Sequence, residues 1–136
     1  MNEEKSEQLF KSGCNCAQAV FAAFADEFSI PEEMALKVSC GLGGGVGRMR
    51  EVCGAVSGAA LVIGMRYGSD KDIVYPKVQE FCEKFKSETG SIVCRELLNG
   101  VSLTTGAKSE ERTEEYYKKR PCVELVKLAA RILKDI

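Results

Sequence analysis

Four of the seven cysteines in this chain follow segments that commonly precede a helix, so each lies at an expected helix start. They are Cys16 after an asparagine, Cys53 after a glycine-rich loop, Cys94 shortly after a Thr-Gly-Ser segment, and Cys122 after a proline. The unpaired N–H groups of a helix start carry partial positive charge, which stabilises a thiolate. Because the thiolate is the form that attacks disulfides and binds metals, these four cysteines are the candidate catalytic residues.

The chain contains no histidine. A Cys–His nucleophile, a histidine-containing zinc site and histidine ligation of haem are therefore excluded within one chain. Any chemistry must use sulfur, carboxylate, lysine, tyrosine or a bound cofactor.

The composition is that of an ordinary globular chain with almost no net charge. Of the 136 residues, 45% are hydrophobic and 29% are charged, and the formal net charge is −1. This length fits one domain over residues 1–136 with a substantial core. The charge gives no basis for binding nucleic acid or an anionic membrane.

The sequence shows neither a signal peptide nor a membrane span. Residues 1–10 are acidic and lack the basic and apolar regions of a signal peptide. The longest apolar stretch, residues 55–65, is too short to cross a bilayer. We therefore expect a cytoplasmic protein, whose cysteines are not static disulfides because that compartment is reducing. The odd number of cysteines also leaves at least one thiol unpaired in a monomer.

Apolar residues recur at helical spacing almost throughout the chain, and no segment alternates with a period of two. We expect helices over about 3–12, 16–27, 31–40, 50–65, 69–87, 91–98, 109–118 and 121–135, with loops at 41–47 and 99–108. Ser29 and Ser69 are the expected caps of two of these helices. The pattern predicts an all-α, single-domain bundle of about five to seven helices, with the four cysteines near one end.

The expected helix after Cys53 is unusually rich in small residues. Gly54 and Gly58 lie four residues apart, on one face of this helix. Glycine inside a helix costs roughly 0.5–1 kcal/mol relative to alanine, so its presence needs a reason. Close packing against another helix is one explanation, and clearance for a cofactor or partner thiol beside Cys53 is another. The same small-residue face makes a homodimer plausible.

The loop GLGGGVG leads into that helix, so its N–H groups are weak candidates for holding an anionic cofactor. The candidate residues are Gly43, Gly44, Gly45 and Arg48. The loop fits neither the dinucleotide nor the phosphate-loop pattern, and no strand precedes it. A tight connection that leaves Cys53 open to approach is the alternative explanation.

Several segments together resemble one known family. They are NCAQAV at 15–20, GLGGGVGRMREVCGAVSGAALVIG at 41–64, CRELL at 94–98 and VELVKLAARIL at 123–133. In combination they resemble the redox-active C_GCAxxG_C_C family, which has four signature cysteines and a CGAxxG motif. The resemblance covers residues 5–135. By position it assigns the four signature cysteines to Cys16, Cys53, Cys94 and Cys122.

The other three cysteines have different expected roles. Cys82 lies on an apolar stripe with Val78 and Phe85, which predicts a place in the core. Cys40 ends a helix, where packing is the favoured explanation. Cys14 forms a C-x-C segment with Cys16 and is a candidate resolving thiol. The sequence does not decide the roles of Cys14 and Cys40.

The cysteine spacings lack the CxxC pairs of zinc ribbons, ferredoxins and thioredoxins, so the spacing alone identifies none of these sites. Three classes of function therefore remain open. The first is a thiol oxidoreductase that exchanges disulfides with a redox partner or a small thiol and needs no cofactor. The second is a module in which the four cysteines bind zinc or an iron–sulfur cluster. The third is a structural or partner-binding bundle. Among the four cysteines, the loop before Cys53 makes it the expected leading nucleophile or ligand.

Overall fold

The computed structural model describes residues 1–101 and 103–136, and the described chain is helical. Its elements are α1 (Asn2–Lys11), α2 (Cys16–Ala23), the 3₁₀ helix η1 (Ala25–Phe28), α3 (Glu32–Cys40), α4 (Gly54–Tyr67), α5 (Lys71–Thr89), α6 (Cys94–Leu97), α7 (Glu114–Lys119) and α8 (Cys122–Leu133). Across the described ranges no strand forms, and the only pairing of this kind is one isolated bridge between Val52 and Val93. The all-α prediction is confirmed, with one α-helix more than the expected five to seven. Position 102, within the expected loop 99–108, lies outside the described residues.

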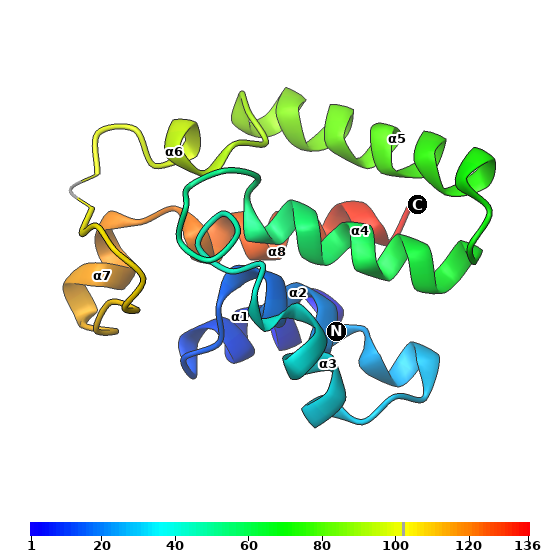
Figure 1. Ribbon diagram of the computed structural model, residues 1–136, viewed down its shortest axis with the longest axis horizontal. Coiled ribbons are helices and arrows are strands. Elements are labelled where there is room, and N and C mark those ends of the chain that lie inside the picture. Colours follow the sequence, from blue (N-terminus) through cyan, green and yellow to red (C-terminus); the bar gives the residue numbers. More distant parts are fainter. Residues whose placement is uncertain (102) are drawn as a thin grey trace.

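The helices pack around one cluster of buried side chains. Helix α2 contacts α1, α3, α4 and α8, while α5 packs on α4 and α8. Figure 1 shows α5 running along one side of α4, with α1, α2 and α3 on the other side. The largest fully buried side chains are phenylalanines, namely Phe10, Phe24, Phe81 and Phe85. Burial of such side chains contributes about 1.5–3 kcal/mol each, which holds these helices together.

The crossing of α2 and α4 is set by small residues. A Cβ atom added to Gly58 would lie 2.8 Å from the carbonyl oxygen of Ala17, and one added to Gly54 would lie 2.9 Å from the Ala17 nitrogen. Both distances are shorter than real Cβ contacts. The small-residue face of α4 is therefore used for close packing within the chain, and that packing brings the starts of α2 and α4 together.

Two predicted helix caps are wrong. Ser29 has a left-handed conformation and ends η1, while Pro31 occupies the cap position of α3 without a side-chain hydrogen bond. Helix α5 is capped one residue later than expected, because the side chain of Asp70, rather than Ser69, accepts a hydrogen bond from the Asp72 nitrogen. Several ends also shift: the expected helix 16–27 divides into α2 and η1, and the expected helix 109–118 begins only at 114.

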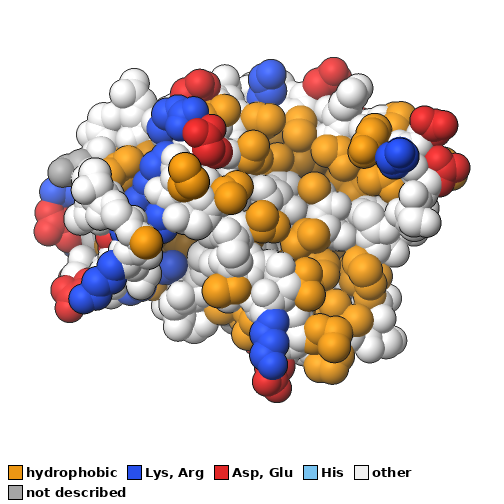
Figure 2. Space-filling view, in the orientation of Figure 1, with side chains coloured by type: hydrophobic (Ala, Val, Ile, Leu, Met, Phe, Trp, Pro, Cys, Tyr) orange, Lys and Arg blue, Asp and Glu red, His pale blue; other side chains and the backbone are white. Residues whose placement is uncertain are grey.

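Hydrophobic side chains reach the surface over α3, α4 and α5, as Figure 2 shows for the face seen in Figure 1. The exposed large hydrophobic residues of these helices are Met34, Val38, Met65, Ile73 and Tyr75. Association into a homodimer stays a prediction. In the described part of the chain, every helix is too short or too polar to cross a membrane.

Candidate functional site

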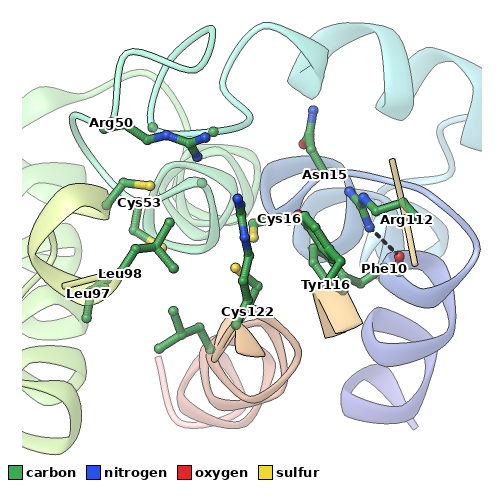
Figure 3. Close-up of a pocket in the computed structure, with 16 residues that line it drawn as sticks. Phe10, Asn15, Cys16, Arg50, Cys53, Leu97, Leu98, Arg112, Tyr116 and Cys122 are labelled. Carbon is green, nitrogen blue, oxygen red and sulfur yellow. Dashed lines mark hydrogen bonds between the residues drawn. The ribbon is translucent and has the colours of Figure 1, made fainter. Parts of the chain in front are cut away.

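The four expected cysteines line one cavity. Cys16, Cys53, Cys94 and Cys122 all border a space of about 50 Å³ at the end of the bundle where α2, α4, α6 and α8 begin. Figure 3 shows Cys16 and Cys122 pointing toward one another across this space, with Arg50 above them. The structure therefore brings together four sulfurs that are far apart in the sequence.

Cys16 is held by the start of α2. The side chain of Asn15 accepts a hydrogen bond from the Gln18 nitrogen at 2.9 Å, and the Gln18 side chain accepts one from the Asn15 nitrogen at 2.9 Å. This reciprocal cap fixes the first turn. The Asn15 amide also donates to the Cys40 carbonyl at 2.9 Å, which ties the start of α2 to the end of α3.

Cys53 and Cys94 lie on two segments joined by the isolated bridge. The Cys53 nitrogen donates to the Ile92 carbonyl at 2.8 Å, and the Cys94 nitrogen donates to the Glu51 carbonyl at 2.6 Å. Each cysteine follows the bridge directly, Cys53 as the cap residue of α4 and Cys94 as the first residue of α6. The bridge therefore sets the relative position of these two sulfurs.

The glycine-rich loop packs against the site. A Cβ atom on Gly45, which has a φ of +72°, would lie 2.7 Å from the Cβ of Cys94. One on Gly43 would lie 2.2 Å from the Asn15 amide. The loop also contains Val46, Arg48 and Arg50 with positive φ, a conformation that is uncommon for such residues. Close approach to Asn15 therefore explains glycine at position 43, and close approach to Cys94 explains it at position 45.

Three arginines border the cavity, and of these only Arg50 lies shortly before Cys53 in the sequence. The others are Arg112 and Arg120, which lie far along the chain. Arg112 donates to the carbonyls of Phe10 and Cys14, at 3.0 and 2.9 Å, and its guanidinium lies 4.5 Å from the Phe10 ring centre. The basic run at 118–120, just before Cys122, is a sequence signal by which Arg120 could have been found.

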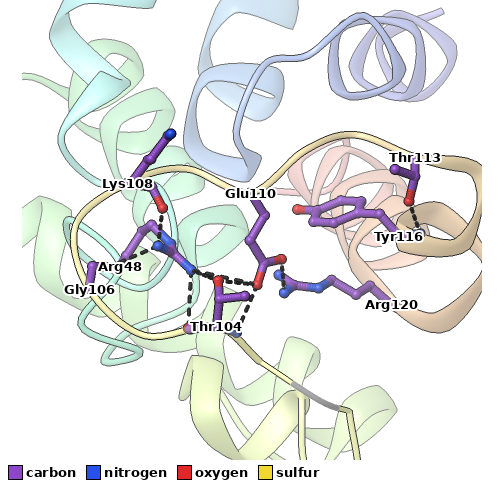
Figure 4. A network of polar contacts seen from close by, with 8 residues as sticks. All are labelled: Arg48, Thr104, Gly106, Lys108, Glu110, Thr113, Tyr116 and Arg120. Atoms are coloured by element: carbon purple, nitrogen blue, oxygen red, sulfur yellow. Dashed lines mark hydrogen bonds and ion pairs between the residues drawn. The ribbon is translucent and has the colours of Figure 1, made fainter.

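Residues 103–113, which we call the strap, contribute Arg112 to the cavity wall and are held by polar contacts (Figure 4). Arg48 donates to the carbonyls of Thr104, Gly106 and Lys108. Glu110 forms ion pairs with both Arg48 and Arg120. Arg48 thus binds the strap. This contact explains why an arginine occupies position 48, and no anionic cofactor is needed to explain it.

The pKa of Cys122 is lowered. A hydrogen bond with Cys16 is the largest cause, and the guanidinium groups of Arg120, Arg112 and Arg50 lower it further against the opposing effect of burial. The same hydrogen bond with Cys122, followed by burial, raises the pKa of Cys16 well above its ordinary value. When this pair loses one proton, the thiolate therefore resides on Cys122 and the remaining proton on Cys16.

The expected leading role of Cys53 is not supported by its surroundings. Burial raises the pKa of Cys53 to about 12, and the N–H groups of Ala55 and Val56 at the helix start lower it by less. Burial also raises the pKa of Cys94, against a hydrogen bond from Arg50. The helix-start effect exists, but burial outweighs it at Cys53. The directions of these pKa shifts favour a thiolate at Cys122 over one at Cys53.

The remaining three cysteines do not line the cavity. Cys82 is half-buried against the hydrophobic core, close to its expected place. Cys40 is exposed at the end of α3. Cys14 is partly buried, and burial raises its pKa.

As a metal centre, the cavity does not fit. Among residues 1–101 and 103–136, no group of three or more cysteine, aspartate or glutamate side chains is arranged to hold one metal ion. The three arginines at the cavity would also repel a free cation. Binding a single zinc or iron ion would require the sulfurs to move.

The fold and the cavity define a class, a small helical protein with four cysteines at converging helix starts. The family described as "Putative redox-active protein (C_GCAxxG_C_C)" matches residues 14–136. This match covers most of the chain, so the chain belongs to the C_GCAxxG_C_C family. No curated protein and no solved structure matches the chain.

Proposed function

We propose that this protein is a thiol oxidoreductase in which Cys122 is the nucleophile and Cys16 is the resolving cysteine. The observation that carries the proposal is that these two thiols face one another inside a cavity bordered by three arginines (Figure 3). A nucleophilic thiolate needs nearby positive charge, and a resolving thiol needs contact with it. The pair of Cys122 and Cys16 satisfies both requirements.

The reaction transfers two electrons from the two thiols to a small disulfide. The Cys122 thiolate attacks one sulfur of the substrate, which breaks the substrate S–S bond, forms a mixed disulfide and releases one thiolate. Cys16 then gives up its proton and attacks Cys122 Sγ. The products are a Cys16–Cys122 disulfide and the second substrate thiol, and the two protons lost by the cysteines go to the two released thiolates.

The other two signature cysteines complete the site. Cys53 and Cys94 border the same cavity, and their raised pKa values keep them protonated while Cys122 reacts. We assign them the role of a second thiol pair that can accept the disulfide from Cys16–Cys122 by exchange. The chemistry needs no metal or organic cofactor. Regeneration by a cytoplasmic thiol pool suits it, because that compartment is reducing.

Disulfide mapping tests the proposal. The reduced protein is treated with hydroxyethyl disulfide, quenched with acid, and its peptides are identified by mass spectrometry. We expect a Cys16–Cys122 link that Cys122→Ser abolishes. In Cys16→Ser, the mixed disulfide on Cys122 should accumulate. Cys82→Ser is the matched control and should exchange as the natural protein does.

Two outcomes would contradict the proposal. One is a protein in which Cys122 stays reduced while Cys82 or Cys40 reacts. The other is a stoichiometric amount of zinc or iron in anaerobically purified protein, with a matching ultraviolet–visible spectrum. That result would favour the four-cysteine metal module.

A further inference from the structure

The wall of the thiol cavity carries positive charge without carboxylates. Its charged residues in the described chain are Arg50, Arg112 and Arg120, and none of its described lining residues is acidic. Only one negative charge, the Cys122 thiolate, is expected inside. The positive charge at the cavity therefore exceeds the negative charge, which favours binding of a further anion.

The three arginines differ in their ion pairs and hydrogen-bond partners. Glu110 neutralises Arg120, and Arg112 donates to two carbonyls while stacking on Phe10. Arg50 donates a hydrogen bond to the Cys94 thiol but has no ion pair with any described residue, and its Nη2 atom is buried without a hydrogen-bond partner among them. A buried donor left unsatisfied is costly, and donors of this kind are nearly always paired in native proteins.

The backbone holds Arg50 in this position. Arg50 has a φ of +62°, and its nitrogen donates to the Gly44 carbonyl at 3.0 Å. Its own carbonyl accepts from the Arg95 nitrogen at 3.1 Å. An uncommon conformation kept by surrounding contacts is typical of a functional position. Figure 3 shows the Arg50 side chain extending over the space between the cysteines.

The size and closure of the cavity restrict its occupant. The volume of about 50 Å³ exceeds one water molecule but leaves no room for a peptide. Cys53, Cys94 and Cys122 are only 4%, 8% and 7% exposed. Such low exposure restricts direct access to small molecules and ions.

We propose that the cavity binds a small anionic sulfur compound of the hydrosulfide or persulfide class, with Arg50 as the residue that holds its charge. This inference rests on the proposed Cys16–Cys122 exchange and names its substrate class. Such a compound has the two features that the cavity favours, which are a single negative charge and a small, reactive sulfur.

The step with hydrosulfide balances without another reactant. Hydrosulfide attacks Cys122 Sγ in the oxidised protein, which breaks the Cys16–Cys122 bond and forms a new S–S bond on Cys122. The proton of hydrosulfide goes to Cys16, which leaves as a thiol. The product persulfide anion on Cys122 remains among the arginines. In the reverse direction, Cys16 gives its proton to the outer sulfur of the Cys122 persulfide and attacks Cys122 Sγ, which restores the Cys16–Cys122 disulfide and releases hydrosulfide.

The test compares a charged and a neutral nucleophile on the oxidised protein. Sodium hydrosulfide is the charged probe, and the added sulfur on the Cys122 peptide is followed by mass spectrometry. A neutral phosphine is the comparison, with disulfide loss as its readout. We expect Arg50→Gln to slow the hydrosulfide reaction about tenfold, from the loss of a hydrogen bond to a charged group, and to leave the phosphine rate within about twofold. Arg131→Gln is the matched control, because Arg131 pairs with Glu3 at the surface outside the cavity.

A second measurement uses the natural protein and so does not depend on the folding of the variant. Potassium thiocyanate, a small unreactive anion here, should slow hydrosulfide more than potassium fluoride does at equal ionic strength, without slowing the phosphine. Equal effects of Arg50→Gln on both nucleophiles, or no competition by thiocyanate, would overturn the anion site. A protein that forms no Cys16–Cys122 disulfide would instead refute the proposed function, and this inference with it.

Discussion

The crossing of α2 and α4 and the strap border the same cavity, yet different forces hold them. At the crossing, Gly54 and Gly58 let two helix backbones touch at Ala17, and apolar burial stabilises the contact. The strap buries little apolar surface and depends on Glu110, which pairs with Arg48 and Arg120. The Glu110 and Arg120 side chains are only 15% and 6% exposed, so these ion pairs are shielded from water.

This difference assigns separate tasks to the two regions. The crossing sets the distance between the sulfurs, because a packed interface resists gradual deformation. We expect the strap to affect which molecules reach the sulfurs, because it contributes Arg112 to the cavity wall and a segment with few buried contacts can open without unfolding the rest. Changes at the crossing should therefore alter stability, and changes at the strap should alter access.

The largest effect should come from filling the crossing. In Gly58→Ala the new Cβ would lie 2.8 Å from the Ala17 carbonyl oxygen, so the two helices must separate. We expect the free energy of unfolding to fall by about 1–3 kcal/mol, measured by urea denaturation. Gly64→Ala is the matched control on the same helix, since a Cβ there meets nothing within 4 Å. It should stabilise by about 0.5–1 kcal/mol, and equal effects of the two variants would refute the close-packing explanation.

A smaller effect on stability, but a clear one on access, should follow from Glu110→Gln. The loss of the carboxylate charge weakens its pairing with Arg48 and Arg120, and the strap opens locally. We expect iodoacetamide to label Cys122 several-fold faster, while the free energy of unfolding changes by less than about 1 kcal/mol. Glu111→Gln, at an exposed neighbour, provides the control. Slower labelling, or global destabilisation as large as that of Gly58→Ala, would contradict the assigned role of the strap.

Two cysteines of the shared cavity, Cys53 at the crossing and Cys122 at the start of α8, should also differ in the pH at which they react. The hydrogen bond from Cys16 and the arginines lower the pKa of Cys122, so its labelling should rise and level off below the ordinary thiol range. Burial raises the pKa of Cys53 to about 12, so its labelling should still be rising at the highest pH that the fold tolerates. Peptide mapping after timed iodoacetamide pulses measures both. The opposite order would restore Cys53 as the nucleophile.

The smallest effect should come from Cys40→Ser. Cys40 is exposed and borders neither the crossing nor the thiol cavity. We expect no measurable change in the disulfide exchange rate and a change in the free energy of unfolding within about 0.5 kcal/mol. Loss of exchange in this variant would place a fifth cysteine in the reaction.

The crossing could be predicted from the sequence, whereas the strap could not. The spacing of Gly54 and Gly58 places both on one helix face, and close packing follows from their size. Glu110 and its partners Arg48 and Arg120 follow no periodic pattern, because their contact depends on how distant loops meet. The four cysteines were identified from local helix-start patterns, and each does lie at the start of a helix or in its cap position.

The expected reactivity of Cys53 rests on a local feature, and the fold adds an effect that opposes it. The stabilising N–H groups of Ala55 and Val56 are a local feature, which the sequence can reveal. The burial that outweighs them comes from α2, the bridge segment and the cavity wall together. Local electrostatics could therefore be read from the sequence, but the desolvation produced by the fold could not.

The position of Cys16 and Cys122 near opposite ends of the chain has a thermodynamic consequence. In the proposed oxidised form, their bond closes a loop of about 100 residues, which lowers the entropy of the unfolded chain and adds up to about 5 kcal/mol to stability. Linkage then requires the native fold to favour that bond by the same amount over the unfolded chain, equivalent to roughly 100 mV in reduction potential. Each substitution that weakens the native fold should therefore be better tolerated by the oxidised protein than by the reduced one.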